Sequence, residues 1–208
     1  MSLATRRDFF IATLIGFAVA LFLVPILTNV NPVFWSPKIQ NIAPLIFGFI
    51  ALANAGLWLG GILGRRSKAI WQFTKYFAVG SLATAIDLGI LNLLSFITGI
   101  FSGYLIIVLN IISFSITLAN AYFLHKFWSF EKNSRPHIAE FSQYAGVTIV
   151  SVVLNSALVY FLTTTLGPPG EMSPPLWENI SKVIAAVPVV IWNFTWYKLL
   201  VFKPDANS

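Results

Sequence analysis

Apolar residues in this chain run in long blocks rather than in the short alternation typical of strands. A helix needs about 20 predominantly apolar residues to cross the hydrocarbon layer of a bilayer. Six stretches meet that length: Phe9 to Thr28, Ile42 to Gly64, Tyr76 to Ile97, Gly103 to Leu124, Tyr144 to Leu166 and Ile180 to Phe202. The pattern therefore predicts an all-α integral membrane protein with six transmembrane helices.

Composition agrees with that prediction and narrows the chemistry. The chain is 57% hydrophobic and 10% charged, whereas a soluble domain is about 45 to 50% apolar. It has no cysteine, which excludes disulfides and thiolate metal sites. His125 and His137 lack metal-ligand spacing, so we expect no metal and no cofactor.

The distribution of Lys and Arg predicts the orientation, because loops rich in these residues stay cytoplasmic. Eleven cations would lie on one side of the six helices, against Lys38 and Lys182 on the other. We therefore expect both termini in the cytoplasm and the protein in the inner (cytoplasmic) membrane. This asymmetry also accounts for the net charge of +6, so nucleic acid is not an expected partner.

The chain contains an internal repeat. Residues 72–94 align with residues 140–162 at an offset of 68, and the segments 125–130 and 197–202 end the two units alike. Each unit holds two helices, so the repeats are expected to be parallel. The last four helices then form a duplicated two-helix repeat in a domain of residues 69–203, preceded by an N-terminal hairpin of residues 1–68.

Asp87 is the only acidic residue inside any of the six apolar runs. A carboxylate at bilayer depth costs about 2.5 to 3.5 kcal/mol on insertion scales, so it usually marks a functional interior. Helical spacing places further polar residues on inward stripes, namely Asn110, Asn120, Asn155 and Asn193. The alternative for these amides is helix packing, where an interhelical hydrogen bond contributes about 0.6 kcal/mol.

Residues 70 to 203, approximately, resemble the GtrA-like family of four-helix membrane proteins. The resemblance implies a role in cell-surface polysaccharide or glycolipid synthesis, by movement of a polyprenyl-phosphate-linked sugar between leaflets. The first two helices lie outside the family pattern. The matching residues are Lys75 to Gly80, Thr84, Asp87-Leu88, Asn110, Ser113-Phe114, Asn120, Lys126 to Phe130, Tyr144, Asn155, Lys182, Trp192 to Phe194, Lys198 and Val201-Phe202.

A mechanism follows as a hypothesis. Lys75, Lys126 and Lys198, at cytoplasmic helix ends, would attract the lipid phosphodiester. The sugar would hydrogen-bond to Asp87 and to the four asparagines, and Lys182 would receive the phosphate near the outer side, unless it only snorkels to the interface. The expected partners are the lipid-linked sugar, membrane lipids, a membrane glycosyltransferase and, as an option, a second copy in a homo-oligomer.

Two other functions fit the same residues. Asp87 could serve a proton-coupled exporter of small cations, in which a buried acid exchanges protons. Alternatively, the protein is a non-transporting scaffold or anchor for a glycosyltransferase, bound through the segment Arg65 to Lys75. Catalysis is not expected, because the sequence has no serine, histidine and acid constellation, no paired carboxylates on one face and no glycine-rich phosphate loop.

Overall fold

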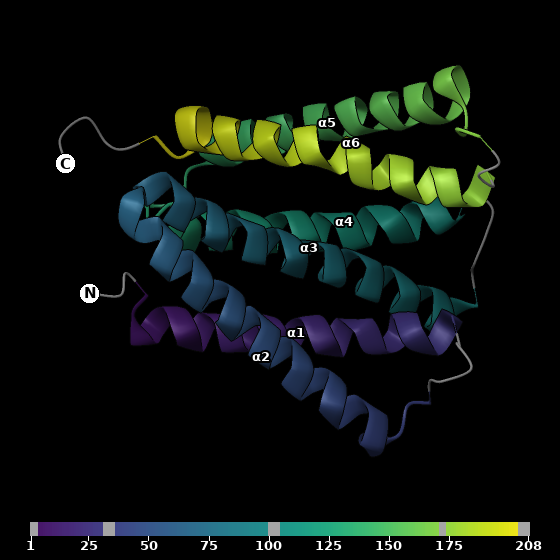
Figure 1. Ribbon diagram of the computed structural model, residues 1–208, viewed down its shortest axis with the longest axis horizontal. Coiled ribbons are helices and arrows are strands. Elements are labelled where there is room, and N and C mark those ends of the chain that lie inside the picture. Colours follow the sequence, from purple (N-terminus) through teal and green to yellow (C-terminus); the bar gives the residue numbers. More distant parts are fainter. Residues whose placement is uncertain (1–3, 31–35, 100–104, 171–173, 204–208) are drawn as a thin grey trace. The chain divides into compact units, whose positions relative to one another are not determined.

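The computed structural model describes residues 4–30, 36–99, 105–170 and 174–203, all of whose regular structure is helical (Figure 1). Three of the α-helices continue into short π-helical segments, and one into a 3-10 turn. The elements are α1 (Arg6–Val30), α2 (Ile39–Leu63), η1 (Gly64–Arg66), α3 (Lys68–Thr98), α4 (Leu105–Leu124), η2 (His125–Ser129), α5 (Ile138–Tyr160), η3 (Phe161–Leu166), α6 (Pro174–Trp196) and η4 (Tyr197–Val201).

The described residues include four helices long and apolar enough to cross a membrane. They span Arg6–Thr28, Ile39–Arg66, Lys68–Thr98 and Ile184–Val201. The all-helical prediction is thus confirmed, and the protein is a multi-pass membrane protein, whereas the count of six spans stays a prediction. The 31 residues of α3 rise about 46 Å at 1.5 Å per residue. Because the hydrocarbon core is about 30 Å thick, part of α3 extends beyond it.

Polar caps explain why two helices begin before their apolar runs. Ser67 has extended backbone geometry, and its hydroxyl accepts a hydrogen bond from the Ala69 amide at 3.3 Å, which starts α3. The Nδ1 atom of His137 accepts from the Ala139 amide at 3.2 Å and starts α5 in the same way. At the other end of α3, Gly99 adopts φ 70°, a left-handed conformation that glycine tolerates and that ends the helix.

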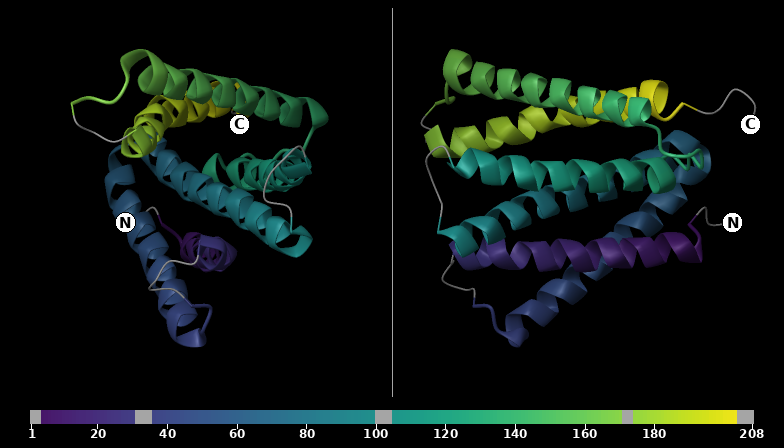
Figure 2. Two further views of the ribbon diagram at one scale, coloured as in Figure 1. Left: turned by 90° about the vertical axis from the view of Figure 1, so that its right-hand side faces the viewer. Right: turned by 180° about the vertical axis from the view of Figure 1, so that it is seen from behind.

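The chain divides into two compact units, residues 1–131 and 132–208. In the first unit α1 packs on both α2 and α3, α3 packs on α4, and α2 runs obliquely across α1 (Figure 1). The second unit is a helical hairpin in which α5 lies beside α6 (Figure 2). The predicted domain boundary at residues 68 and 69 follows the family pattern and stays a prediction.

Glycines allow α1 to approach α2 within the N-terminal hairpin, and they allow α1 to approach α3. A Cβ added at Gly16 would lie 2.5 Å from the Phe49 carbonyl oxygen, so α1 and α2 touch through backbone there. A Cβ at Gly89 would lie 2.6 Å from the carbonyl oxygen of Phe22, at the crossing of α1 and α3. Small residues drive helix association in lipid because they allow such close approach.

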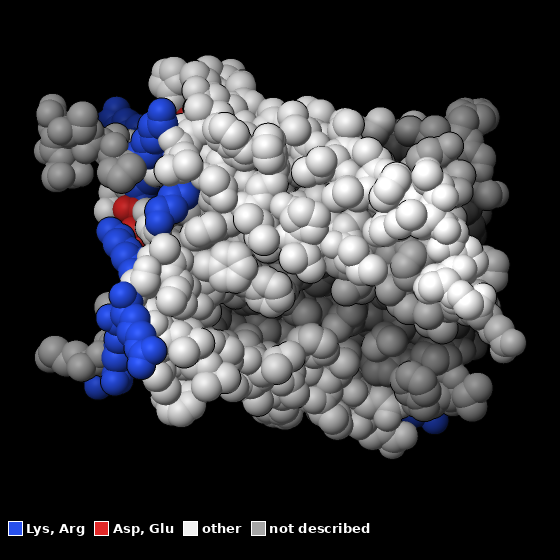
Figure 3. All heavy atoms as spheres, turned by 45° about the horizontal axis from the view of Figure 1, so that its top comes forward, with Lys and Arg blue, Asp and Glu red and all other residues white. Residues whose placement is uncertain are grey.

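Most basic residues of the described chain lie at one end of the helices of their unit (Figure 3), whereas Lys38 precedes the opposite end of α2. In the first unit Arg6 and Arg7 begin α1, while Arg65 and Arg66 lie in η1 after α2. In the second unit Lys198 lies in η4, at the end of the last helix. This clustering is what the predicted cytoplasmic location of both termini requires, and the orientation itself stays a prediction.

Candidate functional site

Asp87 on α3 is held by a serine of α4. The Ser113 hydroxyl donates to Asp87 Oδ1 at 2.7 Å, and Ser113 is completely buried while Asp87 is half-buried. Asp87 lies about 18 Å along α3 from Lys75, at 1.5 Å per residue. A polar pair at that distance from the basic end falls deep within a layer about 30 Å thick.

The polar residues of α4 differ in burial. Ser113 and Thr117 are buried, and among the described residues Thr117 Oγ1 has no hydrogen-bond partner. Asn120 is exposed at the surface of the helix instead. The Asn110 side chain lies outside the described residues. Asn120 therefore does not share the buried face of α4 that carries Ser113 and Thr117.

Lys75 lies in a buried cluster of charges at the basic end of the first unit. Its ammonium is 2.9 Å from Asp8 Oδ1 and 2.8 Å from Glu131 Oε1. The ring of Trp71 lies beneath it, with 4.7 Å from Nζ to the ring centroid. Trp128 donates its indole N–H to Asp8 Oδ1 at 2.9 Å. Lys75 is thus matched by acids from α1 and from the segment that follows η2.

The other predicted cations have different surroundings. Lys126 is fully buried, with its Nζ 5.9 Å from the ring centroid of Tyr122 and 5.8 Å from that of Phe127. Lys198 is half-buried, and its Nζ lies 5.9 Å from the centroid of Phe194. The Lys182 side chain lies outside the described residues. Of the three predicted phosphate-binding lysines, Lys198 is the most accessible.

The second unit contains polar atoms without partners. The Asn155 Oδ1 atom is buried and accepts no hydrogen bond from any described residue, and the Trp192 indole N–H is likewise unpartnered there. The Asn193 carbonyl oxygen accepts from the Ser151 hydroxyl, which pairs α6 with α5. Buried polar groups are almost always satisfied, so an orphaned acceptor and donor call for an explanation.

Both predicted repeats end in the same arrangement. The rings of Tyr76 and His125 stack with centroids 4.8 Å apart, and those of Tyr144 and Tyr197 stack at 4.5 Å. Burial lowers the pKa of His125 from 6.5 to about 3, so the imidazole is neutral at ordinary pH. Its Nδ1 lies 3.3 Å from the Ser129 hydroxyl.

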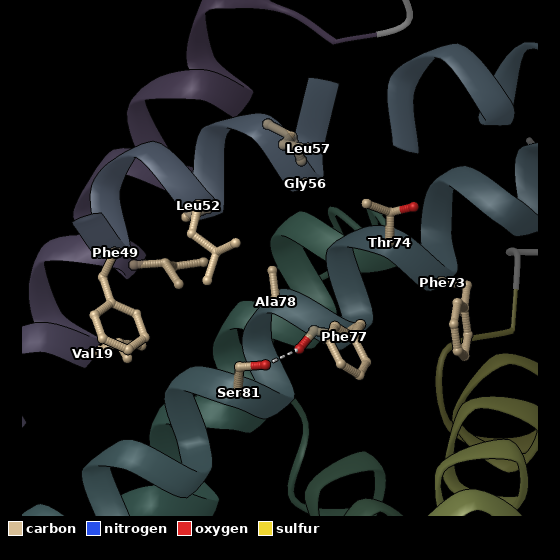
Figure 4. A pocket seen from close by; sticks show the side chains of 13 residues that line it. Val19, Phe49, Leu52, Gly56, Leu57, Phe73, Thr74, Phe77, Ala78 and Ser81 are labelled. Atoms are coloured by element: carbon tan, nitrogen blue, oxygen red, sulfur yellow. Dashed lines mark hydrogen bonds between the residues drawn. The ribbon is translucent and has the colours of Figure 1, made fainter. Parts of the chain in front are cut away.

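An apolar cavity of about 430 Å³ lies between α1, α2 and α3 (Figure 4). Phe49 and Leu52 of α2 and Phe77 of α3 form much of its wall. The Ser81 hydroxyl, although it lines the cavity, donates to the carbonyl of Phe77 in its own helix at 3.0 Å. The cavity therefore presents almost no free polar group and suits a hydrocarbon chain.

Sequence reasoning missed Asp8, Trp128 and Glu131 as members of the Lys75 cluster. Asp8 stands in the first turn of α1, next to Arg6 and Arg7, where an acid is readily explained by the helix dipole. The signal that could have found Asp8 is its position as an acid beside Arg6 and Arg7, at an otherwise basic helix end. The partner could not be identified before the docking of α1 on α3 was known.

Long apolar helices, with a carboxylate deep in the apolar region and basic residues at helix ends, define a multi-pass membrane protein. Residues 75–202 match the family described as GtrA/DPMS, transmembrane domain. Since the match covers more than half of the chain, the protein belongs to this family. No curated protein and no solved structure matches the chain.

Proposed function

We propose that this protein moves a polyprenyl-phosphate-linked monosaccharide from the cytoplasmic to the outer leaflet, for cell-surface polysaccharide or glycolipid synthesis. Membership of the GtrA family, which is associated with polysaccharide synthesis, supports this proposal. The observation that carries the finer proposal is the Asp87 and Ser113 pair, because it offers hydrogen-bonding groups to a polyol deep between α3 and α4. In this proposal the protein itself performs no covalent chemistry.

The amides of the second unit support the same proposal. Asn155 occupies the position equivalent to Asp87 in the predicted repeat, and its unpartnered oxygen is an acceptor for a sugar hydroxyl. The unpartnered indole N–H of Trp192 is a donor of the same kind. A sugar entering the membrane loses its hydration, so groups that replace those hydrogen bonds lower the barrier to crossing. Asn120 and Asn193 retain their proposed roles as further sugar contacts.

In this proposal, lysine side chains bind the phosphate of the lipid substrate on each side of the membrane. Lys198 is a half-buried cation at the basic end of the second unit, and Lys182 would take over the phosphate near the outer side. Lys126 is buried under aromatic rings, so its contribution would require exposure of the ammonium during transport. The prenyl tail stays in lipid, and the apolar cavity between α1, α2 and α3 offers it a place beside the protein.

The proposed orientation brings the basic helix ends to the cytoplasmic side of the membrane. Six spans with both termini in the cytoplasm place the basic ends of both units at the inner face of the cytoplasmic membrane, where a membrane glycosyltransferase would supply the lipid-linked sugar. Lysines and arginines at that face also attract anionic headgroups, which concentrates a phosphate-bearing lipid there. No nucleic acid has a role in this scheme.

The test is leaflet transfer of a polyprenyl-phosphate monosaccharide in proteoliposomes. Native protein should transfer the lipid, and Asp87→Asn should abolish transfer because the amide removes the charge and one acceptor oxygen. Thr84→Val is a matched control, since Thr84 is exposed on the same helix and its hydroxyl bonds only its own backbone in the structure, to the Gly80 carbonyl at 3.1 Å. Absence of transfer by native protein would contradict the proposal. Cation export driven by a proton gradient, with lipid transfer absent, would favour the exporter alternative.

A scaffold for a glycosyltransferase is the second candidate, and the exposure of α2 favours it. Large apolar side chains of this helix face outward, with Phe47 71% and Trp58 55% exposed. Such a face suits lipid or a partner helix. Pull-down of a membrane glycosyltransferase that is lost on replacing Phe47 and Trp58 by alanine, while Asp87→Asn binds normally, would support the scaffold.

A further inference from the structure

The two oxygens of the Asp8 carboxylate serve different groups. Oδ2 accepts the Thr5 amide at 2.9 Å and the Thr5 hydroxyl at 2.7 Å, which closes a capping box at the start of α1. Oδ1 accepts the Trp128 indole N–H at 2.9 Å and lies 2.9 Å from the Lys75 ammonium. One oxygen therefore caps the helix, and the other fills a cationic pocket built by α3 and η2.

This pocket is an anion site rather than a surface ion pair. The exposed fraction is 5% for Asp8, 2% for Lys75 and 3% for Trp128. A surface pair contributes little, but a buried cation must be matched by an anion because its desolvation costs several kcal/mol. Glu131 also contacts Lys75, yet its side chain is 50% exposed. Asp8 is thus the anion that fills the buried part of the pocket.

The pocket is formed by residues of the segment that matches the family, but Asp8, which fills it, lies outside that segment. Lys75 and Trp128 lie within residues 75–202, whereas Asp8 comes from α1, outside that match. The predicted second repeat has Gln143 in place of Lys75 and Leu200 in place of Trp128. The anion site is therefore specific to the first repeat, and it is the site that the additional helix covers.

We propose that Asp8 is an internal substitute for phosphate. The phosphate of the lipid substrate displaces the Asp8 carboxylate from Lys75 and Trp128 and thereby releases the first turns of α1. This inference rests on the proposed function and adds two features to it: a phosphate site that includes the Trp128 indole, and a latch supplied by the N-terminal hairpin. A phosphodiester carries the same single negative charge as the carboxylate, so the exchange leaves the charge of the pocket unchanged.

The rest of α1 is anchored, which confines the movement to its start. The Asn54 amide donates to the Thr13 hydroxyl at 3.0 Å, and Gly16 touches the backbone of Phe49. Thr13 lies about 8 Å along the helix from Asp8, at 1.5 Å per residue. The released part is thus the segment before Thr13, while the hairpin stays docked.

The experiment uses spin labels, since the chain has no cysteine to remove. Labels at Phe10→Cys and Ile116→Cys report the separation of α1 from α4, and both native side chains are exposed, at 63% and 48%. The protein is placed in nanodiscs and titrated with farnesyl phosphate, with farnesol as the uncharged control. Farnesyl phosphate is a monoester with about 1.5 to 2 negative charges at pH 7, so it competes with the Asp8 carboxylate at least as well as a phosphodiester does. Farnesyl phosphate should add a longer, saturable distance population, and farnesol should leave the distances unchanged.

Variants then assign the effect to the pocket. Asp8→Asn keeps an oxygen for the capping box but loses the charge, so farnesyl phosphate should bind about tenfold more tightly, the effect of removing one competing charge-assisted contact. Trp128→Phe keeps the ring and loses the donor, so binding should weaken. The double variant Asp8→Asn with Lys75→Gln avoids an unpaired buried carboxylate and should not bind. Thr84→Val is the control and should bind as the native protein does, because the Thr84 hydroxyl donates to the Gly80 carbonyl of its own helix and does not contact Asp8 or Lys75.

The outcomes separate this inference from the proposed function. If farnesyl phosphate leaves the distances unchanged and Asp8→Asn binds no more tightly, Asp8 is only a structural ion pair and the inference fails, whatever the leaflet assay shows. If the phosphate displaces Asp8 but no lipid is transferred by native protein, the phosphate site stands and translocation fails.

Discussion

Tyr76 stacks on His125 with ring centroids 4.8 Å apart, which joins α3 to the first residue of η2. The equivalent stack in the predicted second repeat joins Tyr144 to Tyr197 at 4.5 Å. After each stack the chain closes alike. The Phe130 amide donates to the His125 carbonyl at 2.9 Å, and the Phe202 amide donates to the Tyr197 carbonyl at 2.7 Å. The same corner is therefore built once around an imidazole and once around a phenol.

This difference predicts a pH dependence of stability. His125 has a pKa of about 3 in the folded protein, against about 6.5 when unfolded. Below pH 6.5 the unfolded state binds a proton that the folded state does not, so stability is full above pH 6.5 and falls as the pH is lowered. Between pH 6.5 and 5 the loss should be about 2 kcal/mol, at 1.36 kcal/mol per unit.

Thermal unfolding in detergent at pH 7.5, 6.5 and 5 measures this dependence. His125→Tyr, which copies the corner of the second repeat, should remove most of it. Equal melting temperatures of the native protein at the three pH values would contradict the assignment of a buried neutral imidazole.

Gly89 and Gly80 form a matched pair on α3. A Cβ at Gly89 would press on the Phe22 backbone, whereas a Cβ at Gly80 meets nothing within 4 Å. Gly89→Ala should destabilise the protein by about 1 to 3 kcal/mol through overpacking between α1 and α3. Gly80→Ala should be neutral or stabilising, because alanine is the better helix former by about 1 kcal/mol. Thermal unfolding of both variants in the same detergent makes the comparison, and equal melting temperatures would contradict the close crossing.

Asp87→Asn should separate stability from function. An ionised carboxylate at bilayer depth costs about 2.5 to 3.5 kcal/mol, and an amide can still accept the hydrogen bond from Ser113. The variant should thus melt at the same or a higher temperature while losing lipid transfer. A marked fall in melting temperature would instead identify Asp87 as a structural residue.

The Tyr197 hydroxyl lies 2.7 Å from Thr148 Oγ1, and the Thr148 hydroxyl in turn donates to the Tyr144 carbonyl at 2.9 Å. Tyr197 is therefore the donor to Thr148. Tyr197→Phe keeps the stack and removes this bond, so the second unit should lose about 0.5 to 1.5 kcal/mol. A double-mutant cycle with Thr148→Val measures the coupling free energy between the two hydroxyls, which should be of the same size. A coupling free energy close to zero would contradict the hydrogen bond.

The amino-acid sequence by itself determined the class, the family and the approximate helices, because runs of apolar residues respond to the bilayer and not to neighbouring helices. The apolar runs differ from the observed helices mainly at the helix ends. The apolar run from Tyr76 begins eight residues after α3 does, since Lys68 to Lys75 are helical for reasons of capping and packing that hydropathy does not register. Asp87 was identifiable from its sequence context, because an acid in an apolar run is rare whatever its partner.

Only the tertiary structure decided what the polar residues contact. Lys75 and Lys126 were both predicted to bind phosphate from their positions at helix ends. Lys75 is paired with Asp8 and Glu131. Lys126 is buried against the rings of Tyr122 and Phe127. Asn120 follows Thr117 by three residues but is exposed, because the facing helix and not the spacing sets which part of α4 is covered. Asp8 reaches Lys75 across 67 positions of sequence. Such a contact depends on the glycine-mediated docking of α1 on α3, which local sequence cannot specify.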